Sequence, residues 1–366
     1  MTGKRGVSAF VFFLLTLCIF IVLISDTETA ILHVRKGINL CFKVVVPSLF
    51  PFMVLSGLFV ELGCADILSK IFAAPMKAIF GLSGAGASAP IMGALCGFPV
   101  GASVAHRLYK GGRISKNELQ RLLTFSNIPG SAFLISAVGW SLWSSTHFGT
   151  VLYVIQIISA LLIGLFLRIL YTPEKKDCSE NVSSEVSFGI GNFLRVVSDS
   201  SVSMLNVCAL VLFFAAFVGA LVSILEKFDL SQGTIAVIYG FFEMSGAVGA
   251  AALVPSRELG MVLTALICGW SGLSIHFQVI SVCEQDGISF VPYFAAKAAQ
   301  GVLSAFFMFI YIKFINKGLP YLCLPTIFVD GHSLGNTAFA FFTNAVMLTV
   351  GIIAYPLYFF SRARKK

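Results

Sequence analysis

The chain has 366 residues, of which 57% are hydrophobic and only 11% are charged. Soluble domains carry about 25% charged residues, so this chain cannot cover a water-facing surface and must have the bilayer as its main solvent. Its net charge of +8 is local, because the basic residues flank apolar runs. That placement follows the positive-inside rule and excludes nucleic acid as a partner.

Long runs of the chain contain no Asp, Glu, Lys or Arg, namely 7–25, 44–60, 78–105, 122–167, 200–225, 259–283 and 333–361. About 20 helical residues cross a bilayer core of about 30 Å, and the run 122–167 is long enough for two crossings. These runs do not alternate polar and apolar residues, which excludes a β-barrel. The sequence predicts an all-α, polytopic transmembrane bundle with roughly eight to ten membrane-embedded segments.

The orientation of the chain follows from its charges. Lys4 and Arg5 precede the first apolar run, five basic residues lie in the loop 107–121, and four more lie at the end of the chain. We therefore expect both termini and this loop in the cytoplasm. Residues 1–30 should form a retained N-terminal transmembrane helix, because no small-x-small cleavage site follows the first run.

Two later lysines complicate this orientation. Lys313 and Lys317 also favour the cytoplasm, which conflicts with a full final span over 333–361 that ends inside. A re-entrant segment over 319–330 would remove the conflict.

One polar stretch divides the chain. Residues 172–192 are rich in Ser, Lys, Glu and Asp and are too polar to pack in a core, so we expect a cytoplasmic linker. The membrane halves are then 1–171 and 193–366. Each half opens with a long apolar helix, 39–62 or 195–225, and each continues with glycine-rich interruptions.

Four interruptions occur in the same order in the two halves. They are 93–101 and 126–130 in the first half, and 240–249 and 269–273 in the second. Repeated halves with matching Gly- or Pro-broken helices indicate the binding site of a transporter. The alternative for any single glycine is close packing of membrane helices.

The first half offers a binding edge at its breaks. Proline removes a backbone donor, and broken helices at membrane depth are tolerated where they are buried or line a cavity. Flanking glycines let the chain unwind there. We expect substrate-binding positions at Gly97, Pro99, Gly101, Asn127, Pro129 and Gly130.

Two charged residues lie inside apolar runs of the second half. Glu243 lies near the middle of 230–256, where a charge costs on the order of 3 kcal/mol, so we expect it to couple transport to an ion or proton. Lys297 is a candidate for attracting an anion, although its long stem could equally reach an interface.

A polar cluster follows Trp270 and gives the second binding edge. Its expected substrate-binding positions are Ser271, Gly272, Ser274, His276 and Gln278. Ser274 and Gln278 share a helical face at i and i+4, whereas His276 points elsewhere. The alternative for the histidine is a hydrogen bond to a neighbouring helix.

Enzymatic function is not expected. Residues 331–335 match the GxSxG motif of α/β-hydrolases, but no acid or histidine follows Ser333 and no alternating β/α pattern surrounds it. The chain contains no Walker A loop, GxGxxG or HExxH motif, and its nine cysteines are scattered. We expect no cofactor and no metal.

Three segments together resemble a known family. Residues 97–101 (Gly-Phe-Pro-Val-Gly), 111–127 and 272–278 (Gly-Leu-Ser-Ile-His-Phe-Gln) are similar to the YlbJ-like sporulation integral membrane proteins, within the nucleoside-recognition (Gate) domain superfamily. The resemblance covers roughly residues 40–310. It implies a membrane transporter or channel that moves dipicolinic acid across the outer forespore membrane.

The partners implied are the lipid bilayer and a small polar or anionic solute, with dipicolinate suspected. A homo-oligomer and other sporulation membrane proteins stay open as further partners. Two other functions also stay open, a nucleoside-type solute transporter and a non-transporting membrane scaffold in spore assembly.

Overall fold

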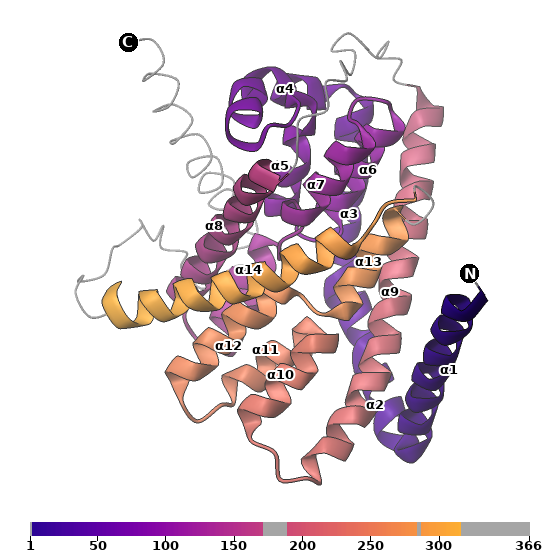
Figure 1. Ribbon diagram of the computed structural model, residues 1–366, viewed down its shortest axis with the longest axis vertical. Coiled ribbons are helices and arrows are strands. Elements are labelled where there is room, and N and C mark those ends of the chain that lie inside the picture. The colour runs from indigo at the N-terminus through magenta and orange to yellow at the C-terminus, as the bar shows by residue number, and fades with distance from the viewer. Residues whose placement is uncertain (1, 171–188, 284–286, 316–366) are drawn as a thin grey trace.

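The computed structural model describes residues 2–170, 189–283 and 287–315. Helices make up most of this part of the chain, and no strand occurs within it, which confirms the predicted all-α membrane fold (Figure 1). Most of the predicted linker, the re-entrant segment 319–330, the motif at 331–335 and the run 333–361 lie outside the described residues.

The α-helices are α1 (Thr2–Ser25), α2 (Thr27–Leu40), α3 (Val46–Glu61), α4 (Cys64–Pro75), α5 (Ser88–Cys96), α6 (Val100–Lys110), α7 (Lys116–Phe125), α8 (Thr146–Leu170), α9 (Ile190–Glu226), α10 (Gln232–Phe242), α11 (Met244–Ala252), α12 (Arg257–Trp270), α13 (Leu273–Cys283) and α14 (Val291–Ile310). Shorter π- or 3₁₀-helical segments are η1 (Cys41–Val45), η2 (Met76–Phe80), η3 (Gly84–Ala87), η4 (Ala132–Leu142) and η6 (Tyr311–Ile315).

Long apolar helices give the chain its membrane spans. Four described helices are long and apolar enough to cross a membrane, over Thr146–Ile169, Ile190–Glu226, Arg257–Cys283 and Val291–Phe314. The number rises to six if each of two sharply bent helix pairs counts as one span. The chain is therefore an integral membrane protein.

The first half contains a helical hairpin at one of its breaks and a broken span at the other. Helices α5 and α6 pack against each other as a hairpin. The segments α7 and η4 pack one after the other along α8, with Phe125 at Gly164 and Gly139 at Gly149, and so form one span broken at 126–130. The backbone N–H of Ser83, before α5, donates to Glu118 in the first turn of α7 at 2.6 Å. Both arms of the hairpin and the start of α7 therefore lie at one end of the molecule, which we call the basic end because the loop 107–121 is there.

The second half repeats this order upside down. Helices α10 and α11 form a hairpin, α12 and α13 form one broken span, and α14 returns. Gly287, before α14, lies against Lys116 at the basic end, while Lys313 after α14 binds Glu258 of α12 at 3.0 Å. The α10–α11 hairpin therefore enters from the end opposite to that of the α5–α6 hairpin.

Local sequence signals explain where several of these short helices begin. Ser115 and Glu118 form a capping box at the start of α7, each bonding the backbone N–H of the other. Ser231 and Ser256 cap α10 and α12 more simply, since each side chain accepts one hydrogen bond from the backbone N–H three residues later. Arg121, expected in a cytoplasmic loop, is instead buried and donates to the carbonyls of Phe80 and Gly81 at the end of η2.

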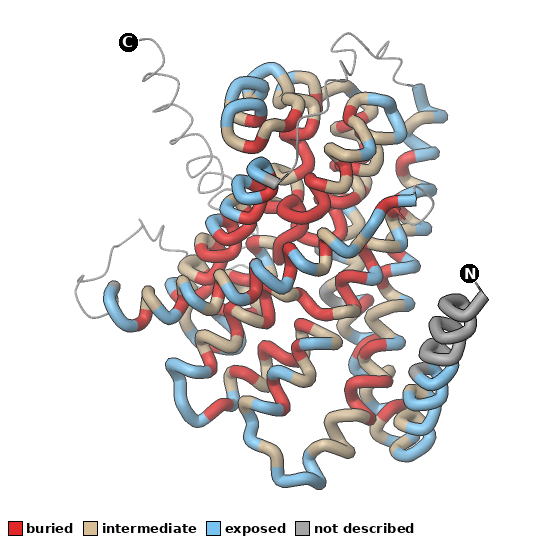
Figure 2. Tube along the Cα trace, viewed as in Figure 1, coloured by how far each residue is buried: buried red, intermediate tan, exposed pale blue. Residues whose placement is uncertain are grey.

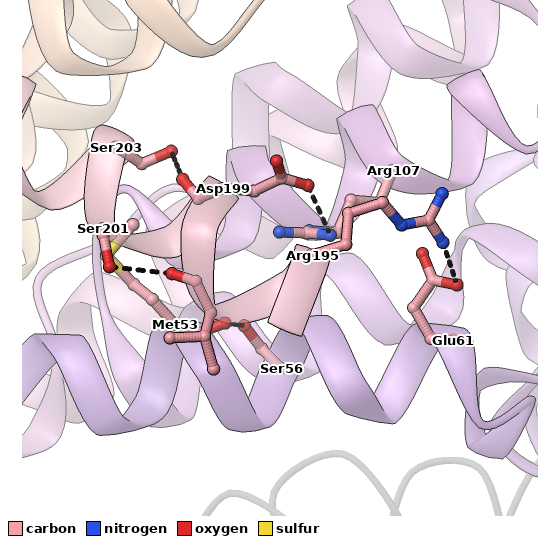
Figure 3. A network of polar contacts seen from close by, with 9 residues as sticks. Met53, Ser56, Glu61, Arg107, Arg195, Asp199, Ser201 and Ser203 are labelled. Atoms are coloured by element: carbon pink, nitrogen blue, oxygen red, sulfur yellow. Dashed lines mark hydrogen bonds and ion pairs between the residues drawn. The ribbon is translucent and has the colours of Figure 1, made fainter. Parts of the chain in front are cut away.

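A charged cluster joins the two halves at the basic end. Arg107 at the end of α6 lies 3.8 Å from Asp199 of α9, and Arg195 of α9 donates to Glu61 of α3 at 2.9 Å (Figure 3). The Arg107 guanidinium also lies over Gly57 of α3. We call these four charged residues the basic-end cluster.

Candidate functional site

The two breaks of the first half lie against each other. A Cβ atom on Gly93 or Gly101 would approach the carbonyl oxygen of Ser126 to 1.8 or 2.2 Å. One on Gly97, whose φ is +84°, would lie 2.7 Å from the backbone nitrogen of Gly130. Only glycine permits this contact, so the glycines predicted as break residues hold the hairpin tip against the broken α7–η4 span.

Asn127 joins these two breaks by hydrogen bonds. Its side-chain oxygen accepts from the backbone N–H of Ala102 at 3.0 Å, which caps the first turn of α6, and its amide donates to the carbonyl of Leu123 at 2.9 Å. Pro99 is the residue immediately before α6, and both Pro99 and Pro129 are buried. The predicted edge of the first half is thus assembled as one unit.

The two breaks of the second half also meet. Glu243 adopts an extended conformation between α10 and α11, and Ser271 and Gly272 have positive φ between α12 and α13. A Cβ on Gly272 would lie 3.1 Å from the backbone nitrogens of Glu243 and Met244. This arrangement matches the first half, with a hairpin tip set against a broken span.

Glu243 is engaged in a way that the sequence did not predict. Its two carboxylate oxygens accept from the backbone N–H groups of Ser245 and Gly246, each at 2.7 Å. The side chain therefore caps the N-terminus of α11, where the helix dipole favours a negative charge. The charge is half-buried at the hairpin tip.

Helix α14 touches one break of each pair. The Lys297 Nζ donates to the carbonyl of Asn127 at 2.8 Å and to the side-chain oxygen of Gln300 at 2.8 Å. One turn later Gly301 packs directly on Gly269, before the second-half break. The fully buried ammonium group also lies 5.9 Å from the centre of the Phe98 ring, at the tip of the α5–α6 hairpin.

A buried polar chain extends from Lys297 between α8 and α14. Gln300 and Ser304 donate to the side-chain oxygen of Gln156, each at 3.3 Å, and Ser304 also bonds Ser159 at 3.2 Å. All of these side chains are inaccessible to solvent. None of these side chains except Lys297 was predicted from the sequence, although the i, i+3, i+7 spacing from Lys297 and the i, i+3 spacing of Gln156 and Ser159 place each set on one helical face.

His276 lies inside an aromatic cluster beside α14. Its Nδ1 and the Tyr293 hydroxyl share a hydrogen bond of 3.0 Å, and its ring contacts Trp270 and Phe294 at centroid distances of 4.4 and 5.0 Å. Its Nε2 is buried and has no hydrogen-bond partner. Ser274 and Gln278 are buried on the same helix.

The predicted positions thus form two contacting groups, joined through α14. All of them are buried except Gly130 and Glu243. They belong to the buried interior of the bundle (Figure 2). Among the described residues, no group of three or more His, Cys, Asp or Glu side chains could hold a metal ion.

Comparison with known proteins now adds to this geometry. Residues 42–166 match the Gate family, whose description is nucleoside recognition. The matched segment extends from the residues before α3 into α8 and so contains both breaks of the first half.

The whole chain also has a relative of similar length. It is 25% identical over 359 residues to the sporulation integral membrane protein YlbJ of Bacillus subtilis, covering 85% of this chain and 87% of the relative. No solved structure matches it. The resemblance inferred from the sequence is therefore confirmed, and the match to the Gate family lies within the first half of the chain.

Proposed function

We propose that the chain is a transporter that moves a small anionic solute through a site at the four helix breaks. The observation that carries the proposal is the inverted pair of units, each with a hairpin tip set against a broken span. Transporters with inverted repeats place their sites at such discontinuous helices, and the two units rock around the site.

The charge at the breaks favours an anion. Lys297 is fully buried, and the described part of the chain gives its ammonium group carbonyl partners but no carboxylate. An unpaired charge at membrane depth is costly, so an anionic solute beside it offsets part of that cost. The negative charge of Glu243 is separately engaged with the α11 N-terminus.

The proposed solute is dipicolinate, carried across the outer forespore membrane during sporulation. Support for this comes from the similarity to a sporulation membrane protein and from the chemistry of dipicolinate, a small planar dianion. The description of the Gate family favours a second candidate, a nucleoside, which needs no buried cation.

The experiment complements spores that lack their own YlbJ-like protein with this chain, and measures accumulated dipicolinate. Wild type should restore accumulation, and Glu243→Gln at equal membrane levels should abolish it, because the proposed coupling needs a group that gains and loses charge. Glu258→Gln is the matched control, since Glu258 is exposed and binds Lys313 at the opposite end from the basic loop.

Glu243→Asn separates coupling from capping. Asn is a good N-cap residue but carries no charge, so it should abolish transport if the charge is what matters and retain transport if only the cap is needed. Wild-type transport by Glu243→Gln would remove the coupling role. If the wild-type chain fails to restore accumulation, dipicolinate is ruled out as the solute. Competition by nucleosides in liposomes would then test the second candidate. Tolerance of all substitutions at the breaks would support a scaffold.

A further inference from the structure

Two buried polar groups at the breaks lack any hydrogen-bond partner. They are the His276 Nε2 and the Ser126 hydroxyl, which are both inaccessible to solvent. An unsatisfied buried polar group costs about 1–3 kcal/mol, so natural proteins contain few of them. Both residues are joined to α14, Ser126 through its neighbour Asn127, which binds Lys297, and His276 through Tyr293, so we ask which molecule could complete these groups.

The histidine has a defined role in this set. Its Nδ1 shares a hydrogen bond with Tyr293, and a phenol is a better donor than imidazole whereas an imidazole nitrogen is the better acceptor. The Tyr293 hydroxyl therefore donates to Nδ1, which places the ring hydrogen on Nε2. His276 then presents an N–H donor without an acceptor.

The lysine is connected to each of the other two groups through one neighbouring residue. Its Nζ binds the carbonyl of Asn127, the residue after Ser126. Tyr293, which holds His276, lies one helical turn before Lys297 on the same face of α14. The ammonium group has three N–H donors, of which the described partners take two.

We infer that Ser126 Oγ, His276 Nε2 and Lys297 Nζ form a carboxylate subsite, which binds the acid group of a planar aromatic carboxylate while Trp270 and Phe294 contact its ring. The inference rests on the proposed function and names the chemistry of the solute. Every unsatisfied group in the set can donate, and two of them, the His276 Nε2–H and the Lys297 ammonium, can only donate, so the set favours an acceptor with several lone pairs, as a carboxylate has. A neutral amide presents donors of its own and fits poorly.

The test measures binding of pyridine-2,6-dicarboxylate, benzoate and the neutral diamide of the former to the purified full chain in lipid nanodiscs. Wild type should bind the carboxylates and not the diamide. Ser126→Ala should weaken carboxylate binding about tenfold, which corresponds to one hydrogen bond to a charged group. Lys297→Gln should weaken it further.

Ser88→Ala is the matched control. Ser88 is also fully buried with an unpartnered hydroxyl, but it lies at the far end of α5 from the break. Its removal should leave affinity unchanged, and thermal unfolding of each variant should show that both remain folded.

Two results would overturn the subsite alone. One is equal carboxylate affinity in wild type and folded Ser126→Ala, and the other is a wild type that binds the diamide as well as the acids. Either result can occur while wild type still restores dipicolinate in spores, so failure of the subsite is separable from failure of the proposed function. A wild type that binds no carboxylate would overturn both.

Discussion

At the scale of single residues, the site depends on backbone surfaces without side chains. The carbonyl of Ser126 lies between Gly93 and Gly101, so the α5–α6 hairpin and the broken α7–η4 span share a contact that no other residue could enter. A carbonyl left unpaired by a break at membrane depth must be buried against protein or face a cavity. Glycine provides that burial here.

Substitution of Gly93 by Ala should therefore be strongly destabilising. The new Cβ would lie 1.8 Å from the Ser126 carbonyl, which is backbone and cannot swing away, so we expect a loss of roughly 3 kcal/mol, at the upper end of the cost of overpacking. Thermal unfolding of the purified chain in detergent measures the change.

Gly249→Ala provides the control for this measurement. Gly249 lies inside α11, and a Cβ there would meet nothing within 4 Å, so alanine should be neutral or stabilise by about 0.5–1 kcal/mol. Equal stability of the two variants would contradict the close packing of the first-half breaks.

At the scale of elements, the breaks were predictable but their geometry was not. Glycine and proline mark the interruptions at 93–101, 126–130, 240–249 and 269–273, and the structure interrupts a helix within each. Yet α5 and α6 fold back while α12 and α13 run on, since the direction after a break is decided by packing partners far away in sequence. The cap that Glu243 provides is local, because it bonds residues two and three positions later, but it requires that α11 begin directly after Glu243, which the glycines alone did not indicate.

The polar chain between α8 and α14 shows a second limit. Gln156 and Ser304 are separated by 148 residues, and nothing local indicates that they bond each other. Only the spacing from Lys297 along α14 hints at a polar face. Sequence periodicity can therefore identify a polar face, but tertiary structure is needed to say what it meets.

The basic-end cluster should act as a latch on the α5–α6 hairpin. Reversing the charge in Arg107→Glu would place it beside Asp199 and Glu61, and the hairpin should open more often. Exposed ion pairs contribute about 1 kcal/mol or less, which shifts an equilibrium about fivefold. In a chain that keeps Cys96 as its only cysteine, alkylation from the basic end should accelerate by about that factor.

The double variant Arg107→Glu with Asp199→Arg should return the alkylation rate towards that of the parent. Glu258→Lys, which breaks the pair at the opposite end, should leave the rate unchanged. A rate that rises equally in all three variants would show general loosening instead of a latch.

At the scale of the whole molecule, each of the two units begins at one end of the molecule and finishes at the other, which requires an odd number of crossings. The continuous helix from α2 to α3 pairs with α9, and each is followed by a hairpin, a broken span and a returning helix. This order places Lys313 at the opposite end from the loop 107–121, although the charge rule had favoured the same side for both. One lysine paired with Glu258 is a weak orientation signal.

This orientation can be tested by labelling cysteines from each side. Cysteine at Lys116 or Gly189 should react with an impermeant maleimide from the cytoplasmic side, and cysteine at Lys227 or Pro255 only from the other side. All four positions are exposed in the structure. Labelling of Pro255→Cys from the cytoplasm would overturn the inverted arrangement of the second unit.

The odd number of crossings has a consequence for the origin of the fold. A segment with an even number of crossings, duplicated in tandem, yields two copies facing the same way. A segment with an odd number of crossings yields two copies that face opposite ways, without any other rearrangement of the gene. If one such unit was once encoded by its own gene, its protein product had to insert in both orientations to build the same pair. Fusion of two copies in tandem fixes the opposite orientations of the two units. A weak charge bias in the second unit is what this history would leave behind.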